Sequence, residues 1–311
     1  MPATGNETLQ QEFAQNILQL TQQMQSALIA SVATDETHGK QKRYTNIAKV
    51  TATKKQQRHA TTPNTPATLS NVWTTQEMWE AQDWIDRFDD ARSILGNLTS
   101  ELNISFVSAL NRVIDAVALR SLGGPVTTGE TGGSTVSIAA AQQIAVSSRK
   151  YDPKQGTGDV ALTVYKLQQA AEKIGGAGGT FDGVYQVALP WSQLMSLASD
   201  TRFASWLYNQ NRPVGSGSFR GQWMNYVFNT YEDSLKSTAN YTLDSSADEL
   251  VYVYAREAVK LDFAERLFTR VIEDKDHSFD TDVYASTMVG GARRDLSKVI
   301  QIACDPTGLL L

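Results

Sequence analysis

Cysteine and histidine, the residues most used in metal centres and nucleophilic catalysis, are nearly missing from this chain. Its 311 residues include a single cysteine, Cys304, and three histidines, His38, His59 and His277. One cysteine can form no disulfide within the chain, so nothing indicates a disulfide-stabilised secreted scaffold. The histidines show neither a paired spacing nor a His-Glu-x-x-His motif, so a zinc centre is unsupported. A catalytic cysteine needs a base such as His277 close in space, whereas a small buried apolar residue is the commoner fate of a lone cysteine.

Long apolar runs and an excess of basic residues are missing too. No apolar run approaches the roughly 18 residues of a membrane helix, and the first residues lack the basic start and apolar core of a signal peptide. The formal net charge of −5 argues against a general nucleic-acid binder, because phosphate neutralisation needs a basic surface. With 41% hydrophobic and 20% charged residues, we expect a soluble cytosolic protein of one or two domains.

The motifs that mark common enzyme sites are also missing. The chain has no Gly-x-Ser-x-Gly elbow. The glycines at 175–179 follow a predicted helix and precede a predicted strand, whereas a phosphate-binding loop has the reverse order. The acids of residues 71–90 are spread along the segment and form no Asp-x-Asp-x-Asp-Gly calcium loop. We therefore expect no catalytic residue, no cofactor and no metal site.

The longest predicted element is a helix over residues 99–122. Its apolar residues recur at steps of mostly three to five, the spacing of one helical face. They are Leu102, Phe106, Ala109, Leu110, Val113, Val117 and Leu122. Thr99 is expected to cap the first turn, and Gly123-Gly124-Pro125 to end the helix. The result is a rod of roughly 35 Å with Phe106 in the core.

Residues 1–38, rich in Gln, Ala and Thr, predict an amphipathic helix. Its apolar residues follow one another at steps of three and four. They are Leu9, Phe13, Ile17, Leu20, Met24, Leu28 and Val32. Such a stripe needs a surface to lie on, which is either the rest of its own domain or a different partner.

The next segment, residues 39–70, carries a run of positive charge. Between Gly39 and Ala60 there are basic residues and no acid. The basic residues are Lys40, Lys42, Arg43, Lys49, Lys54, Lys55 and Arg58. The segment has too few apolar residues for a core, but its threonines, with Ile47 and Val50, suit an exposed β-hairpin. It is a solvated loop, a nucleic-acid arm or an arm on a neighbouring subunit.

Residues 71–90 reverse the charge, with tryptophans between the acids. The acids are Glu77, Glu80, Asp83, Asp86, Asp89 and Asp90, against the single base Arg87. A basic and an acidic segment on one chain can pair between copies and set the register of assembly. The residues expected in such subunit contacts are Lys49, Lys54, Lys55, Arg58, Glu77, Glu80, Asp83 and Asp86.

The remaining pattern is that of an α+β protein. Irregular chain is expected over 123–159, a helix over 160–174 and another helix after Pro190. Strands are expected over 184–189, 226–231, 250–256, 259–272, 284–289 and 299–303. Residues 209–221 are expected to form a loop, and 290–297 a turn region.

Four segments stand out in this order of elements. They are Glu77-Met-Trp-Glu-Ala-Gln-Asp-Trp-Ile-Asp-Arg-Phe-Asp-Asp-Ala-Arg92, Leu162-Thr-Val-Tyr-Lys-Leu-Gln-Gln-Ala170, Tyr185-Gln-Val-Ala-Leu-Pro-Trp-Ser-Gln-Leu194, and Val283-Tyr-Ala-Ser-Thr-Met-Val-Gly-Gly-Ala-Arg293 followed by Val299-Ile-Gln-Ile-Ala-Cys-Asp305. In these segments and their order the chain resembles the major capsid (coat) proteins of tailed bacteriophages, whose fold also occurs in the floor of herpesvirus capsids. The resemblance runs from about residue 44 to residue 305. Each segment is uninformative alone, and the four together, around one long helix, carry the resemblance.

The resemblance implies an α+β capsid fold with four parts. These are an N-terminal arm (1–43), an extended β-hairpin loop (44–90), a peripheral domain with the long spine helix (91–122 and 263–311) and an axial domain (123–262). It implies a shell of pentamers and hexamers around double-stranded DNA, built from copies of this chain. The resemblance also implies that the DNA is bound without sequence specificity and that no membrane is involved.

Further partners implied by the resemblance are a scaffolding protein, a portal and a decoration protein. The resemblance also implies that the protein is located in the virion, after assembly in the host cytoplasm. A bacterial encapsulin-type compartment has the same fold and is the closest alternative. An intracellular α+β enzyme and a monomeric binding module are alternatives of other classes.

Overall fold

The computed structural model describes residues 25–55, 57–58, 61, 64–86, 98–149, 158–178, 183–200, 203, 222–223, 225–277 and 279–307. The chain divides into two compact units. Unit 1 comprises Met1–Gln25, Trp79–Asn111 and Leu267–Thr287, and unit 2 comprises Ser26–Met78, Arg112–Arg266 and Met288–Leu311. The loop expected over 209–221 and most of the helix expected over 1–38 fall outside the described residues.

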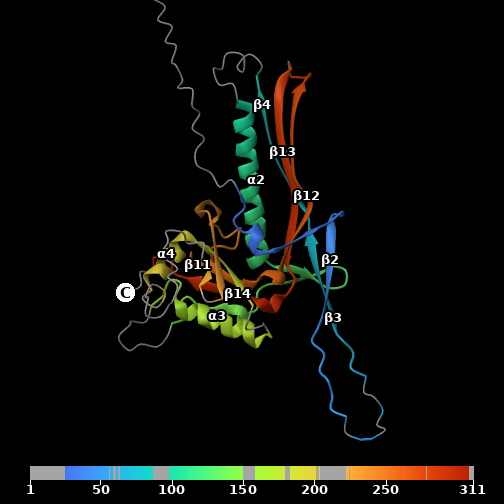
Figure 1. Cartoon of the computed structure of the whole chain (residues 1–311), viewed down its shortest axis with the longest axis vertical. Coiled ribbons are helices and arrows are strands. Elements are labelled where there is room, and N and C mark those ends of the chain that lie inside the picture. Colours follow the sequence, from blue (N-terminus) through green and yellow to red (C-terminus); the bar gives the residue numbers. More distant parts are fainter. Residues whose placement is uncertain are drawn as a thin grey trace, which may run out of the picture. The chain divides into compact units, whose positions relative to one another are not determined.

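The long helix α2 (Leu98–Gly123) confirms the helix expected over 99–122 (Figure 1). Thr99 lies inside its first turn, so the expected role of Thr99 as the preceding cap is wrong. The helix ends where expected, because the Gly124 N–H makes the last hydrogen bond, to the Arg120 carbonyl oxygen at 2.8 Å, and Pro125 has no N–H to continue the pattern. By length and composition, Thr99–Gly123 is apolar enough to cross a membrane, a property that core helices of globular proteins share. Single polar residues interrupt this stretch, which is why the sequence shows no continuous apolar run.

The buried part of α2 lies further along the helix than the sequence pattern predicts. Its buried apolar residues are Leu110, Ile114, Val117, Ala118, Leu119 and Leu122. Phe106 is only half-buried, so its expected place in the core is wrong. The periodic pattern identifies one face of a helix, but it does not identify which turns of that face are covered.

Unit 2 contains a six-stranded sheet in the order β7-β14-β11-β8-β10-β9. Its strands are β7 (Gln143–Ile144), β8 (Tyr185–Pro190), β9 (Gln222–Trp223), β10 (Tyr226–Tyr231), β11 (Glu249–Ala255) and β14 (Val299–Cys304). β11 pairs antiparallel with β8 and β14, and β10 pairs parallel with β8. The strands expected over 184–189, 226–231, 250–256 and 299–303 are therefore confirmed.

Two helices predicted for unit 2 are also confirmed, but the one expected over 160–174 begins only at Val164. α3 (Val164–Gly176) begins after Thr163, whose hydroxyl accepts a hydrogen bond from the Lys166 N–H. α4 (Trp191–Ser199) follows Pro190, whose fixed φ and missing N–H suit the start of a helix.

Strand β11 separates two hydrophobic clusters of unit 2. Successive side chains of a strand point to opposite faces. Val251 and Val253 belong to a cluster with α3 and α4, whereas Tyr252 and Tyr254 belong to a cluster with α2. All four side chains are 0% exposed, so β11 contributes to both cores.

A second sheet has the order β1-β12-β13-β4. Its strands are β1 (Ala33–Glu36), β4 (Glu77–Ile85), β12 (Val259–Asp274) and β13 (Asp280–Arg293). The strands expected over 259–272 and 284–289 are confirmed. The helix expected over 1–38 is wrong for residues 25–38, because β1 takes its hydrogen bonds from a parallel pairing with Lys260–Phe263 of β12.

The turn expected over 290–297 is wrong in its first half, because β13 continues through Arg293. Gly290 and Gly291 lie in the strand at a place where neighbouring atoms come very close. A Cβ at Gly290 would lie 2.4 Å from the Thr75 carbonyl oxygen, and one at Gly291 would lie 2.2 Å from Ser121 Oγ of α2. The two glycines therefore allow β13 to pass close to Thr75 and Ser121, and they do not form a turn.

The third sheet, β2-β3-β5-β6, contains the base of the hairpin. Its strands are β2 (Gln41–Ile47), β3 (Leu69–Thr75), β5 (Val126–Thr128) and β6 (Ser134–Val136). β2 and β3 pair antiparallel from Gln41↔Thr75 to Ile47↔Leu69, which confirms the expected β-hairpin (Figure 1). The irregular chain expected over 123–159 is wrong in part, because β5, β6 and β7 lie within it.

Short 3-10 helices complete the description of the fold. They are η1 (Ile29–Ser31), η2 (Ala140–Gln142), η3 (Asp233–Leu235), η4 (Arg256–Ala258) and η5 (Leu296–Lys298).

The contrast between two glycines gives a test of the packing. Gly291→Ala is expected to lower the free energy of unfolding by about 1–3 kcal/mol, because its Cβ would overlap Ser121 Oγ. Gly175→Ala is the matched control, since its Cβ meets nothing within 4 Å and it lies in α3. That control is expected to gain about 0.5–1 kcal/mol. Urea unfolding measures both, and equal effects of the two substitutions would contradict the packing described.

Candidate functional site

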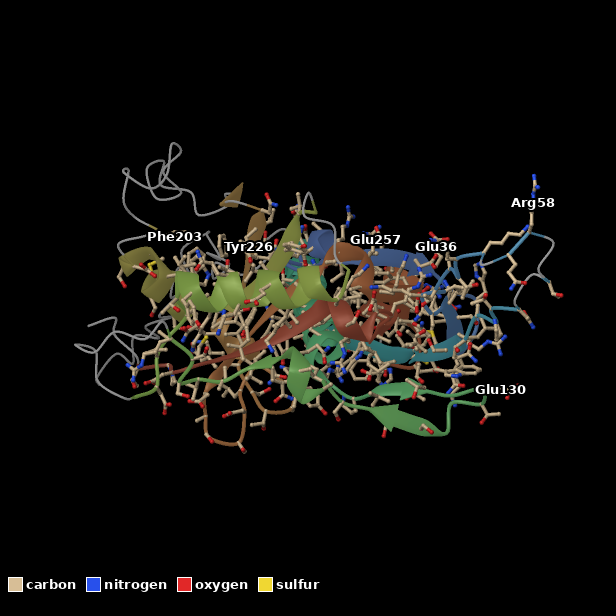
Figure 2. All side chains as sticks on the ribbon, turned by 90° about the horizontal axis from the view of Figure 1, so that it is seen from below. Glu36, Arg58, Glu130, Phe203, Tyr226 and Glu257 are labelled. Carbon is tan, nitrogen blue, oxygen red and sulfur yellow. The ribbon has the colours of Figure 1, made fainter. Side chains whose placement is uncertain are left out.

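The connection between β2 and β3 extends away from the rest of unit 2 and carries exposed positive charge. Lys49, Lys54, Lys55 and Arg58 are all exposed. Figure 2 shows Arg58 at the far end of this connection, beyond Glu36 and Glu130. Within the described part of the chain, no hydrogen bond or ion pair engages Lys54, Lys55 or Arg58. This end of the hairpin is therefore a group of cations with full access to another molecule.

The base of the hairpin is held by a buried carboxylate. Asp262 of β12 is 0% exposed. It accepts hydrogen bonds from the Tyr44 hydroxyl of β2 and, at 2.6 Å, from Thr74 Oγ1 of β3. The Lys42 ammonium of β2 lies 3.6 Å away. Because both hairpin strands donate to one buried acceptor, their position on β12 is fixed.

A second carboxylate, on β1, completes this group of residues. Lys42 Nζ lies 2.7 Å from Asp35, and this hydrogen bond keeps the pKa of the Asp35 carboxyl below its ordinary value. Burial, with hydrogen bonding to Asp262, raises the pKa of Tyr44 far above its ordinary value. Tyr44 therefore stays protonated and remains a donor. We call Asp35, Lys42, Tyr44, Thr74 and Asp262 the hairpin clamp.

A further contact ties the start of the connection to its own chain. Lys49 Nζ donates to the Ala177 carbonyl oxygen at 2.7 Å, and Ala177 is the C-cap of α3. A cation at this position complements the negative end of the helix dipole. Lys49 thus differs from the three cations farther along, because it already has a partner in unit 2.

An open groove lies beside the hairpin base in unit 2. Its volume is about 1310 Å³. Residues of β2 and β3 line one part of it, and Glu257, Arg294 and Lys298 line another. Asn46 Nδ2 donates to the Arg294 carbonyl oxygen at 2.7 Å, which holds β2 at this place.

The predicted acidic residues Glu77, Glu80 and Asp83 lie on β4, an edge strand of its sheet, and Asp86 follows the strand; all four are exposed. Glu77 pairs with Arg120 at 3.1 Å. Glu80 accepts a hydrogen bond from the Tyr284 hydroxyl at 3.2 Å, and Asp83 accepts one from the Trp84 N–H at 2.9 Å. Asp86 ends the row beyond Ile85 and also has a partner. The carboxylates remain accessible to solvent in spite of these contacts.

Exposed aromatic rings accompany the acids in unit 1. Trp84 is 49% exposed and stacks on His277 at a centroid distance of 4.8 Å. His277 pairs with Asp274 at 2.6 Å, and this hydrogen bond raises the pKa of the imidazole. Among the residues that the structure describes, no group of three or more His, Cys, Asp or Glu side chains could hold a metal ion.

Cys304 is a buried residue, as expected. It is 0% exposed within the cluster formed with α3 and α4, and burial raises the pKa of its thiol to about 12. The thiolate that a nucleophile needs is therefore disfavoured. The glycine run also has the expected order, because Gly176 ends α3 and β8 begins at Tyr185.

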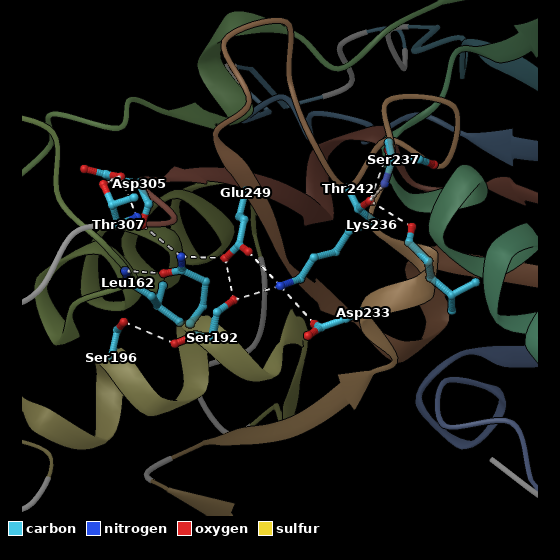
Figure 3. Close-up of polar contacts among 12 residues, drawn as sticks. Leu162, Ser192, Ser196, Asp233, Lys236, Ser237, Thr242, Glu249, Asp305 and Thr307 are labelled. Carbon is cyan, nitrogen blue, oxygen red and sulfur yellow. Dashed lines mark hydrogen bonds and ion pairs between the residues drawn. The ribbon is translucent and has the colours of Figure 1, made fainter. Parts of the chain in front are cut away.

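A polar network that the sequence does not reveal joins five segments of unit 2 around the buried side chains of Gln193 and Glu249 (Figure 3). Gln193 of α4 donates to Glu249 of β11 at 2.7 Å and to the Asp305 carbonyl oxygen at 3.0 Å. It also accepts from the Leu162 N–H at 2.8 Å. Lys236 lies 2.8 Å from Glu249. Each of these polar groups has a partner, so the network fixes the segments without an unpaired charge.

Comparison with known proteins identifies the family. A sequence profile of the phage capsid protein family matches residues 6–306, nearly the whole chain. The chain belongs to this phage capsid protein family, a family of structural components of the virion. No match is found among curated proteins.

Solved capsid structures share the fold at low sequence identity. The capsid of the cyanophage Pam1 has a TM-score of 0.69 at 12% identity and covers 93% of this chain and 94% of its own. The capsid of the cyanophage P-SCSP1u has a TM-score of 0.65 at 15% identity, with 94% and 91% covered. The capsid of Ralstonia phage GP4 has a TM-score of 0.63 at 11% identity, with 98% and 97% covered. The expected fold class, an α+β tailed-phage capsid fold, is therefore confirmed.

The hairpin clamp gives a test of what positions the hairpin. Asp262→Ala is expected to lower the free energy of unfolding by about 2–3 kcal/mol, because the hydroxyls of Tyr44 and Thr74 lose their buried charged acceptor, whereas Lys42 keeps Asp35. The amides of β2 and β3 should also lose protection from hydrogen exchange. Asp35→Ala is the matched control, because its ion pair with Lys42 is partly exposed and should change stability by less than about 1 kcal/mol. Equal effects of the two variants would show that the buried carboxylate does not hold the hairpin.

Proposed function

We propose that this chain is the major capsid protein of a tailed phage. Copies of it assemble into pentamers and hexamers, and these tile an icosahedral shell around a double-stranded DNA genome. The observation that carries this proposal is the match of the phage capsid family over residues 6–306. The hairpin, held at its base and bare at its end, supports it, because such a segment gains its contacts from another molecule.

The proposed division of the chain follows the capsid fold. The N-terminal arm is 1–43 and the extended loop is 44–90. The peripheral domain comprises 91–122 and 263–311, and the axial domain is 123–262. The six-stranded sheet with α3 and α4 supports the axial assignment, since most of its residues come from that range.

In this proposal, copies of the chain assemble through complementary surfaces, without a chemical reaction. Each copy offers one surface to the next copy, and such heterologous contacts close into rings of five and six. The cations at 54–58 of one copy meet the carboxylates of β4 on a neighbour, which steers the encounter and sets its register. Individual contacts of this kind are weak, and their number makes the shell stable. The function needs no catalytic residue, no cofactor and no metal.

The other proposed partners follow from the same function. A scaffolding protein guides closure, a portal occupies one vertex, and a decoration protein binds the outer surface. The net charge of −5 suits a container whose packaged DNA must enter and leave without tight binding. The shell is assembled in the host cytoplasm, and no membrane takes part.

Neutralising the end of the hairpin tests its role in assembly. Lys54→Ala/Lys55→Ala/Arg58→Ala should fold normally, because these side chains have no partner within the described residues, and it should form far fewer shells. Lys49→Ala is the comparison variant, because its partner is Ala177 of its own chain. Shell yield by sedimentation and folding by circular dichroism provide the measurements. Shells in normal yield from the triple variant would remove these cations from the mechanism.

A charge exchange identifies the acidic partner. Lys54→Glu/Lys55→Glu should block assembly, and combining it with Glu80→Lys/Asp83→Lys should restore part of the shell yield. The second pair alone should also impair assembly. Restoration in the combined variant is specific to pairing between these segments, and its absence would assign the cations to a different partner.

A further inference from the structure

In unit 1, the end of β4 is attached to the turn between β12 and β13. Both lie at the same end of their sheet (Figure 1). The indole of Trp84 on β4 and the imidazole of His277 in the turn stack at a centroid distance of 4.8 Å, with 23° between their planes. His277 Nδ1 also lies 2.6 Å from the carboxylate of Asp274, the last residue of β12. One imidazole therefore contacts β4 and β12 together.

The ring stack is one of three contacts that one face of β4 makes. Glu80, Gln82 and Trp84 are each two residues apart, so their side chains project from the same face of the strand. Glu80 accepts a hydrogen bond from the Tyr284 hydroxyl at 3.2 Å, and Gln82 Nε2 donates to Asp282 at 2.9 Å. Of the three contacts, only the one at Trp84 involves a histidine, the residue whose charge ordinarily changes between about pH 5 and 8. The attachment of the end of β4 is therefore open to control by pH.

Carboxylates around the imidazole favour its positively charged form. The hydrogen bond to Asp274 raises the pKa of His277, and the negative charges of Asp276 and Asp280 add to this effect. Within the described residues, the other charged side chains of the turn and of the end of β4 are Lys275, Asp83 and Asp86. Acids thus outnumber bases around the ring on both elements that it contacts.

Protonation strengthens both contacts of the imidazole. The charged ring forms an ion pair with the Asp274 carboxylate and a cation–π contact with the Trp84 ring. Because the pKa of His277 is raised, both contacts are at full strength below the ordinary histidine pKa of about 6.5. They weaken as the pH rises through the raised pKa. The end of β4 is therefore held more firmly in weak acid than in weak base.

We propose that protonation of His277 holds the end of β4 on the β12–β13 turn and so makes the carboxylates of β4 a pH-dependent interaction surface. Asp83 precedes Trp84 and Asp86 is two residues beyond it, so an indole held in place also fixes the backbone that carries both acids. Carboxylates in a fixed position lose less entropy on binding than mobile ones do. The partner is the cationic hairpin of a second copy, an assignment that rests on the proposed function.

Tryptophan fluorescence tests the ring contact in the full chain, in assembled and unassembled protein alike. A protonated imidazole stacked on an indole quenches its emission. The emission of the wild type relative to that of His277→Gln should therefore rise with pH, with a midpoint above about 6.5. Asp274→Asn should lower this midpoint, and the pH-dependent difference should disappear when Trp84→Phe is added to both proteins.

The matched control for fluorescence is His38→Gln, at another exposed histidine. Its emission should follow that of the wild type at every pH. The proposal would be overturned if the difference between the wild type and His277→Gln did not depend on pH. A midpoint that Asp274→Asn leaves unchanged would overturn it as well.

Hydrogen exchange tests whether the imidazole holds the strand. At about pH 6, the amides at 83–86 should exchange several-fold faster in His277→Gln than in the wild type, and at about pH 9 the two rates should be equal. Comparing two proteins at one pH removes the ordinary pH dependence of amide exchange. The amides of β11 should keep their rates, which shows that the variant remains folded. Equal rates at 83–86 at about pH 6 would contradict the proposal.

Shell yield, measured by sedimentation, connects this attachment to assembly. At about pH 6, His277→Gln should give several-fold fewer shells than the wild type, and at about pH 9 the two yields should agree. If fluorescence and exchange respond as expected and the yields do not, the attachment stands and the β4 carboxylates are removed from the proposed shell contact. If shells form normally and neither fluorescence nor exchange responds, the attachment is wrong and the proposed function stands.

Discussion

The hairpin depends on one buried carboxylate. Asp262 brings a negative charge into the interior of unit 2, where it is tolerated only because β2 and β3 supply donors to it. The same contacts fix the base of a segment whose far end is bare. The contacts of Asp262 therefore mark a boundary in the hairpin. Below it, β2 and β3 are held by their own chain, and beyond it, the exposed cations are available to another molecule. The proposed shell contact relies on this separation, since a hairpin loose at its base would lose more entropy on binding.

The rest of unit 2 supports that base through shared packing. β11 contributes to two cores at once, and the Gln193–Glu249–Lys236 network joins α4 to β11 and to the chain after β14. Burial along α2 is uneven, because Leu119 and Leu122 are fully buried whereas Phe106 is only half-buried.

Much of this fold can be predicted from the sequence, because periodic patterns of apolar residues indicate the buried faces of helices and strands. The long helix, β8, β10, β11, β14 and the hairpin all follow from local spacing and turn residues. The clamp does not, because Asp262 becomes an acceptor only when β2, β3 and β12 meet, and such long-range pairing leaves no local pattern. The single sign available was an acid, Asp262, placed between two apolar residues, Leu261 and Phe263. Phe106 and Gly291 differ from the sequence prediction for a related reason, because a periodic pattern does not show which turns of a helix are covered or which atoms lie against a glycine. The row of acids on β4 was visible in the sequence, whereas its partner on another copy remains a prediction.

Particle size tests the central claim most directly. The full chain, expressed alone and with a candidate scaffolding protein, would be examined by sedimentation and negative-stain electron microscopy. The account predicts closed shells, or rings of five and six, in at least one of the two preparations. A homogeneous monomer in both, at low and high salt, would contradict it, because a shell protein that never associates has no use for a hairpin anchored at one end and bare at the other.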